Sequence, residues 1–350
     1  MDQSLSEEQL EEFNNIFQKH QYQIVKLIGQ GGYGAVFHVR SLKYNSDFAA
    51  KRCKISEEEK SDGMVEIEAL MKLDHPNIIA IYEYFIEDNY LYLILEYCSG
   101  GSLQSKIEQN GPLLPVMIQN IGVQVIHALL TCHQMNIAHS DIKPGNILID
   151  QFGRAKLADF GISRQVLTDQ KIQQNVGTLA FLPPEALLKH PSSPFSADVY
   201  ALGVTFYYLA SGKLPYGNVH SKNALISAIL QHDIQPLENQ PPELISLIGK
   251  MIEYSCDLRI KANELLDHPF FSLQFLKATP SRKSSFLSNS SLKLSTTNLL
   301  LPKSQSTANM DDPILVANTH VSSYHHLGVK PSSGRFQRKK TLPKIGTFLE

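Results

Sequence analysis

The dominant period of the hydrophobic pattern in this 350-residue chain changes near residue 100. Before that point apolar and polar side chains alternate, as in half-buried strands, and after Leu103 a helical period dominates. A helical stretch at Glu57–Leu73 interrupts the strands and ends before Pro76, and a later hairpin is predicted at Asn146–Phe160. This order predicts a small strand-rich lobe, a larger helical lobe and a ligand cleft between them. The predicted strands are Tyr22–Ile28, Ala35–Arg40, Phe48–Cys53, Ile79–Ile86 and Leu91–Glu96.

Composition narrows the class of protein. Apolar residues make up 43% of the chain and charged residues 19%, which is enough for a substantial core, and the net charge of −2 argues against a protein that coats nucleic acid. The four cysteines lie far apart, which excludes a disulfide framework and a thiolate zinc site. We expect a cytoplasmic protein, with the nucleus left open, because the sequence shows no signal peptide and no apolar stretch long enough to span a bilayer.

The charge is divided unevenly along the chain. Residues 277–350 carry 11 Lys/Arg and 3 Asp/Glu, a net of +8, which leaves residues 1–276 with 21 basic and 31 acidic residues, a net of −10. The segment after Thr279 is rich in serine and threonine, so we expect 273–350 to be a mostly disordered basic tail. At the other end, Ser6-Glu7-Glu8-Gln9 matches a capping box, which predicts that 1–21 is a helical extension packed against the main domain, 22–272.

A glycine-rich run, Gly29-Gln30-Gly31-Gly32-Tyr33-Gly34, lies between the first two predicted strands. A dinucleotide-binding fingerprint requires a helix directly after the glycines, and here a strand follows, so that interpretation fails. A glycine loop between antiparallel strands can instead lie over phosphates and donate backbone N–H groups to them. Downstream, Lys51 lies in an apolar strand, where its ammonium requires a partner such as Glu66, unless it is a solvated edge-strand lysine.

A cluster of polar residues provides further chemistry: His139-Ser140-Asp141-Ile142-Lys143-Pro144-Gly145-Asn146, then Asp159-Phe160-Gly161. Phosphoryl transfer uses metal ions that bridge phosphate oxygens, and a carboxylate with an amide oxygen suits them. It also uses a carboxylate that accepts the proton of the attacking hydroxyl. The alternative is that Asp141 and Asp159 are ordinary turn residues.

Together these motifs resemble those of eukaryotic protein kinases, over about residues 22–272. The resemblance implies an α+β fold of two lobes, with a five-stranded antiparallel sheet and one main helix in the N-lobe (22–97) and mostly helices in the C-lobe (98–272). Lys143 and Thr178 resemble residues of the serine/threonine type. The subfamily stays open between calmodulin-dependent-kinase-like and sterile-kinase-like.

The resemblance also assigns roles, with ATP and Mg²⁺ as cofactors. It implies that Asp141 is the catalytic base, that Lys143 neutralises the γ-phosphate, and that Lys51, oriented by Glu66, holds the α- and β-phosphates. The metal ligands would be Asn146 and Asp159. The nucleotide-contacting residues would be Ile28, Gly29, Gln30, Gly31, Gly32, Tyr33, Gly34, Val36, Ala49, Lys51, Leu95, Glu96, Cys98, Asn146, Leu148 and Asp159. Further on, Glu185 would pair with Arg259, and Asp198 would brace the catalytic loop.

Two departures from the family pattern bear on regulation and specificity. Ser140 replaces the arginine that in the family receives an activation-loop phosphate, so we expect switching that does not use this contact. Ser102 and Gly145 stand where basophilic members carry glutamate, which predicts little preference for arginine upstream of the phosphorylated residue.

The sequence therefore predicts a serine/threonine kinase that transfers the γ-phosphate of Mg-ATP to protein hydroxyls. The alternative is a pseudokinase that acts as an ATP-binding scaffold, which Ser140 favours. The basic tail, including Arg335–Lys340, predicts autoinhibition or adaptor binding; a solvated, inactive tail is the alternative.

Overall fold

The fold is taken from a computed structural model, which describes residues 7–31, 34–55, 67, 70–160, 179–217, 219 and 221–272. The predictions for Gly32, Tyr33, Glu66, Thr178 and the tail lie outside these residues.

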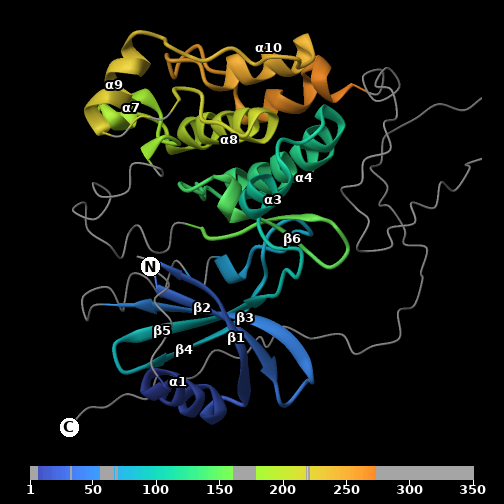
Figure 1. Cartoon of the computed structure of the whole chain (residues 1–350), viewed down its shortest axis with the longest axis vertical. Coiled ribbons are helices and arrows are strands. Elements are labelled where there is room, and N and C mark those ends of the chain that lie inside the picture. The colour runs from blue at the N-terminus through green and yellow to red at the C-terminus, as the bar shows by residue number, and fades with distance from the viewer. Residues whose placement is uncertain are drawn as a thin grey trace, which may run out of the picture. The chain divides into compact units, whose positions relative to one another are not determined.

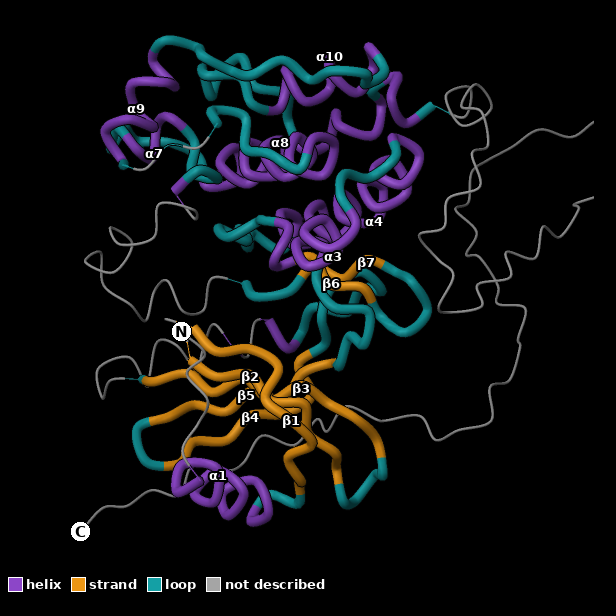
Figure 2. The backbone as a smooth tube through the Cα atoms, viewed as in Figure 1, coloured by secondary structure: helices purple, strands orange, loops and turns teal. Residues whose placement is uncertain are grey.

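The N-lobe is built on one antiparallel sheet of five strands in the order β1-β2-β3-β5-β4 (Figures 1 and 2). The strands are β1 (Tyr22–Gly31), β2 (Gly34–Ser41), β3 (Ser46–Lys54), β4 (Ile81–Glu87) and β5 (Tyr90–Glu96). Burial alternates strictly along β2, so one face of this strand lies in the core and the other faces the cleft side. The prediction of a five-stranded antiparallel sheet is confirmed.

The strand limits differ from the predicted ones by up to three residues, and two of the differences have a clear structural reason. β1 continues through Gly31, because Gly29, Gln30 and Gly31 still pair with β2. The fourth strand was predicted from Ile79, but β4 begins at Ile81. The reason is that the chain at 78–79 pairs with Leu157 in the C-lobe instead of continuing the sheet.

A helix that precedes the sheet, α1 (Glu7–Lys19), packs on the N-lobe core. Phe13 and Phe17 are buried there, and their rings lie 5.2 Å and 5.5 Å from the ring of Phe37 in edge-to-face arrangements. At the end of the helix, Lys19 pairs with Glu87 of β4 at 2.8 Å. The helix therefore completes the hydrophobic core of the N-lobe.

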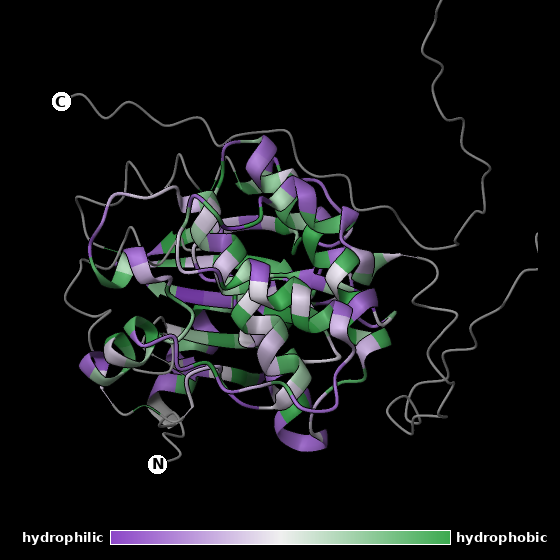
Figure 3. Cartoon of the chain, turned by 90° about the horizontal axis from the view of Figure 1, so that it is seen from above, coloured by the Kyte–Doolittle hydropathy of each residue, from purple (hydrophilic) through white to green (hydrophobic). Residues whose placement is uncertain are grey.

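The C-lobe is mostly helical. Its described helices are α3 (Leu103–Asn110), α4 (Pro115–Gln134), α7 (Pro184–Leu187), α8 (Pro194–Ser211), α9 (Lys222–Leu230) and α10 (Pro242–Met251), with short 3₁₀ turns η1 (Pro144–Asn146), η3 (Ala262–Asp267) and η4 (Pro269–Phe271). Among the described helices only α4 is long and apolar enough to cross a membrane, but side chains such as Ile118, Val125 and Leu129 are fully buried in the C-lobe core. Figure 3 shows apolar and polar residues interleaved along the outer helices, as expected for amphipathic packing.

The central C-lobe helix α8 is buried along most of its length. A Cβ atom at Gly203 would lie 2.6 Å from the Cβ of Met251, so glycine allows α10 to approach closely. Between α4 and α8 in sequence lies the predicted hairpin, β6 (Ile147–Ile149) and β7 (Ala155–Leu157), shorter than predicted because only three residue pairs are in register.

Candidate active site

A cavity of about 460 Å³ lies between the two lobes. Of the residues predicted to contact nucleotide, those that line it are Ile28, Val36, Ala49, Lys51, Leu95, Glu96, Cys98, Asn146, Leu148 and Asp159. The described glycine-loop residues Gly29, Gln30, Gly31 and Gly34 are not among the lining residues. The structure thus brings the predicted residues of both lobes around one space.

Sequence reasoning did not assign several other lining residues to nucleotide contact: Lys26, Ile79, Tyr97, Ser99, Gly101, Ser102, Ser105, Gly145 and Ala158. Four of them, Tyr97, Ser99, Gly101 and Ser102, lie on the hinge, the segment 96–102 that connects the lobes. Tyr97 stacks on His38 of β2 with ring centroids 4.1 Å apart, a contact that no sequence pattern indicates.

Lys51 is the buried cation of this cavity. Its ammonium lies 2.8 Å from Oδ1 of Asp159, and the side chain is 9% exposed. Burial is the largest single influence on the pKa of Lys51 and lowers it, but Asp159, Cys53 and Asp141 together outweigh burial, so the pKa is raised above its ordinary value. The lysine is therefore protonated at neutral pH and available to bind anionic phosphate oxygens.

Residues 139–146, the predicted catalytic loop, bring three of the predicted residues together around the carboxylate of Asp141. Lys143 Nζ donates to Asp141 Oδ2 at 2.8 Å, and Asn146 Nδ2 donates to the same oxygen at 2.9 Å and to the Asp141 carbonyl at 2.8 Å. Two donors thus hold the carboxylate, and its position is fixed before any substrate arrives.

Asp198, at 1% exposed, braces this loop from α8. Its carboxylate accepts from the backbone N–H groups of His139 and Ser140, both at 2.8 Å, and lies 2.9 Å from Nε2 of His133. Ser140 has φ 62°, a left-handed conformation that costs about 1–3 kcal/mol in a residue other than glycine. The Asp198 bonds therefore hold a strained backbone, and the predicted bracing role agrees with this geometry.

His139 is fully buried and links the loop to the residues before Asp159. Its Nε2 lies 2.9 Å from the carbonyl of Ala158, and its Nδ1 is 3.3 Å from the N–H of Asp141. Burial lowers the pKa of His139 despite the nearby carboxylates. The neutral ring with its proton on Nε2 satisfies both bonds, because it donates to the carbonyl and accepts from the amide.

The residues of this site fit a magnesium ion. Asn146 uses its amide nitrogen for Asp141, which directs the amide oxygen elsewhere, and the Asp159 side chain, which is 42% exposed, lines the same cavity. Mg²⁺ is usually held by one or two protein oxygens together with substrate phosphates. The described residues contain no group of three or more His, Cys, Asp or Glu that would form an all-protein metal site.

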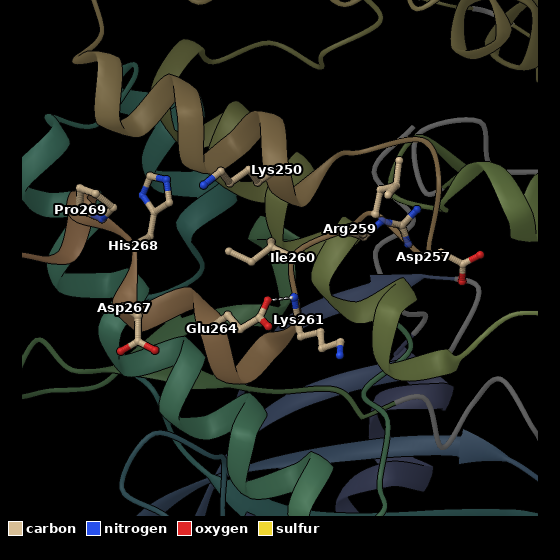
Figure 4. Close-up of a pocket in the computed structure, with 10 residues that line it drawn as sticks. Lys250, Asp257, Arg259, Ile260, Lys261, Glu264, Asp267, His268 and Pro269 are labelled. Carbon is tan, nitrogen blue, oxygen red and sulfur yellow. Dashed lines mark hydrogen bonds between the residues drawn. The ribbon is translucent and has the colours of Figure 1, made fainter.

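A second cavity, of about 540 Å³, lies in the C-lobe beside α10 and η3 (Figure 4). Its wall mixes cations, including Lys250 and Lys261, with the carboxylates of Asp257 and Glu264, and Glu264 accepts from the backbone of Lys261 at 3.1 Å. Arg259 at its edge is held by Glu185 at 2.7 Å, as predicted. None of the predicted catalytic or nucleotide-contacting residues lines this cavity, so the cavity between the lobes is the candidate active site.

Comparison with known proteins indicates the family of this chain. A family model described as protein kinase domain matches residues 22–271. Sperm motility kinase 2B of Mus musculus is 34% identical over 250 residues, which cover 71% of this chain and 51% of that protein. Cytokinesis protein sepH of Aspergillus terreus is 32% identical over 250 residues, 71% of this chain and 18% of that protein. Serine/threonine-protein kinase PLK4 of Nematostella vectensis is 30% identical over 273 residues, which cover 75% of this chain and 28% of that protein.

Two lobes around a cavity that contains these residues define a protein kinase fold, and the family match covers most of the chain. The chain belongs to the protein kinase family. It spans about half or less of the length of the relatives named above.

Proposed function

We propose that this protein is a serine/threonine protein kinase that transfers the γ-phosphate of Mg-ATP to hydroxyl groups of protein substrates. The observation that carries the proposal is the arrangement around one cavity of a buried lysine paired with Asp159 and of a carboxylate held by Lys143 and Asn146. The lobe walls supply apolar side chains for a purine, among them Val36, Ala49 and Leu148.

Each residue would have a defined part in the reaction. Asp141 accepts the proton of the acceptor hydroxyl, whose oxygen forms the new bond to the γ-phosphorus as the bond to the β–γ bridging oxygen breaks and ADP leaves. Lys143, 2.8 Å from that carboxylate, faces the charge on the transferred group, and Lys51 holds the remaining phosphates. A magnesium ion at Asn146 and Asp159 would supply charge neutralisation of the phosphate oxygens.

The arrangement of the loop supports regulation without a phosphate-binding arginine. Ser140 offers no cation, and the loop is held by Asp198 through backbone bonds.

Ser102 and Gly145 leave the rim of the cavity without carboxylates at those positions, which supports weak selection for upstream arginine. We further propose that residues 22–272 are the kinase domain and that residues 273–350 are an inhibitory or adaptor-binding tail. We also propose that the protein is cytoplasmic.

One observation favours a second candidate, a pseudokinase that binds ATP as a scaffold. Ser140 stands at the family's arginine position, so this loop departs from the pattern of active members.

The test measures transfer of labelled γ-phosphate to generic serine/threonine substrates by wild type, Asp159→Asn, Asp141→Asn and the control Asp257→Asn. The control makes the same change at an exposed aspartate of the second cavity. We expect both active-site variants to lose at least about 100-fold in rate and the control to match wild type. Absence of transfer by wild type and by the chain truncated after Leu276, with ATP binding intact, would establish the pseudokinase instead.

A further inference from the structure

An ion pair joins the hinge to the hairpin of the C-lobe. Lys156 Nζ lies 2.7 Å from Oε1 and 2.8 Å from Oε2 of Glu96, the last residue of β5. The side chain of Lys156 is 6% exposed and that of Glu96 is 20% exposed. This charge pair, largely removed from water, therefore connects residues 60 positions apart on opposite lobes.

The two residues that follow this lysine are also tied to neighbouring segments. The N–H of Leu157 donates to the Asn77 carbonyl at 2.8 Å, and its own carbonyl accepts from Ile79 at 3.0 Å. The N–H of Ala158 donates to the backbone carbonyl of Asn146 at 2.8 Å, and the next residue is Asp159. Together with the backbone from Lys156 to Asp159, these hydrogen bonds connect the hinge to the predicted metal ligands Asn146 and Asp159.

We propose that Glu96 and Lys156 form a positioning pair for the nucleotide. The pair fixes the distance between the hinge backbone, which would meet the adenine ring, and Asp159, which would meet the phosphates. The inference rests on the proposed function, because this distance matters only when one ligand spans both ends of the cavity.

Stability alone gives little reason for such a pair. Removing two charges from water is costly, and an apolar pair of similar size is often as stabilising or more so. An apolar contact, however, allows strands to shift against each other, whereas two short charge-assisted hydrogen bonds from one ammonium limit how far the strands can move apart. A small displacement of binding groups can reduce the efficiency of a site by about 100-fold.

The pKa of the Cys98 thiol depends on both charges of the pair. It lines the same cavity, and burial raises its pKa to about 12, with Glu96 raising the pKa further and Lys156 lowering it. Removing the glutamate charge should therefore increase the thiolate fraction, and removing the lysine charge should decrease it. General loosening of the hinge would instead expose the thiol in both variants.

The test measures binding of Mg-ADP by calorimetry and alkylation of Cys98 by iodoacetamide. The variants are Lys156→Met, Glu96→Gln, the double variant, and Lys156→Arg, which keeps the cation. Lys19→Met is the matched control, because it breaks an exposed ion pair of the N-lobe, in which the lysine side chain is 66% exposed. Thermal unfolding checks that each variant is folded. The double variant removes both members of the Glu96–Lys156 ion pair, so neither charge is left buried without its partner.

We expect the double variant to bind Mg-ADP at least about 10-fold more weakly, equivalent to about 1.4 kcal/mol, while Lys156→Arg and Lys19→Met bind like wild type. Alkylation should be faster in Glu96→Gln and slower in Lys156→Met. Wild-type affinity in the folded double variant, or wild-type alkylation rates in both single variants, would overturn the positioning role alone. Faster alkylation in both single variants would show that the hinge is released when the pair is broken, which agrees with the positioning role. Failure of wild type to bind Mg-ADP would refute the proposed function and this inference together.

Discussion

Single side chains in this protein hold backbone geometry that the chain would not adopt by itself. Asp198 receives two backbone N–H groups of the catalytic loop, one of them from Ser140 in a left-handed conformation. His268 acts similarly at the end of the fold, where its Nδ1 accepts from the N–H of Phe270, 3.3 Å away, and caps η4. Its Nε2 lies 3.3 Å from the hydroxyl of Ser246.

The ring of His268 makes stability depend on pH. Burial and then Lys250 lower its pKa below the ordinary value of 6.5. The neutral ring therefore stabilises the fold above pH 6.5, and this contribution is lost as the pH falls through the lower folded-state pKa. We expect His268→Gln to lose about 1 kcal/mol of unfolding free energy at pH 7.5 and to show a smaller further loss at pH 5.5 than wild type.

Urea unfolding at the two pH values measures this difference. His190→Gln, at an exposed histidine, serves as the control and should follow wild type. An equal loss on acidification in His268→Gln and wild type would show that the buried ring does not contribute.

Sequence reasoning found those site residues that form short local motifs. Lys51, Asp141, Asn146 and Asp159 stand in recognisable runs, and the structure brings them together. The Glu96–Lys156 pair was missed because its members are far apart and belong to no motif. The signal was present, however: Lys156 lies in an apolar strand, and a buried ammonium there requires a partner just as Lys51 does.

At the scale of elements, α1 belongs to the N-lobe core through its aromatic face. Phe17 is fully buried and lies 5.6 Å, edge to face, from Tyr92 of β5. Arg52 of β3 lies between two rings, with its guanidinium carbon 3.3 Å from the centre of Tyr90 and 4.7 Å from that of Phe13. Without α1 these aromatic surfaces would face water.

We expect Phe17→Ala to reduce the free energy of unfolding by about 3–5 kcal/mol, because it removes a fully buried ring from a packed cluster. Leu10→Ala is the matched control: this residue lies on the same helix but is 40% exposed, and its replacement should change stability by about 0.5 kcal/mol or less. Urea denaturation measures both. Similar small losses would mean that α1 adds little to the domain.

The number and approximate limits of the strands followed from alternation of apolar residues, because one face of the sheet is buried. Their antiparallel direction was implied by the resemblance to protein kinases. The order of the strands did not, since the pairing of β3 with β5 joins segments that are distant in sequence. The start of β4 was misplaced for a related reason. Ile78 and Ile79 have the composition of a strand and do pair, but with Leu157 of the other lobe.

At the scale of the whole molecule, opposite charges are concentrated in different parts of the chain. Residues 277–350 carry a net charge of +8 and residues 1–276 a net charge of −10. Their mutual attraction is the physical basis for proposing that the tail inhibits the domain.

Truncation after Leu276 should therefore raise kinase activity by roughly 5-fold or more, the range of typical coupling between sites. Added salt should raise the activity of the full chain toward that of the truncated one, since the screening length falls from about 10 Å at 0.1 M to about 3 Å at 1 M. Assays with a neutral peptide substrate measure both effects. Replacing Arg335, Arg338, Lys339 and Lys340 by glutamine should mimic truncation, and unchanged kinetics in both variants would exclude autoinhibition.

The hydrogen bonds between residues 77–79 and Leu157 affect how the two lobes can move relative to each other. The lobes are joined there as well as at the hinge, where Glu96 meets Lys156. Adjacent residues of β7, Lys156 and Leu157, make the two attachments, so the attachments lie together at one place on the lobe boundary. A movement of one lobe relative to the other would therefore change the far side of the cleft more than the wall next to these residues.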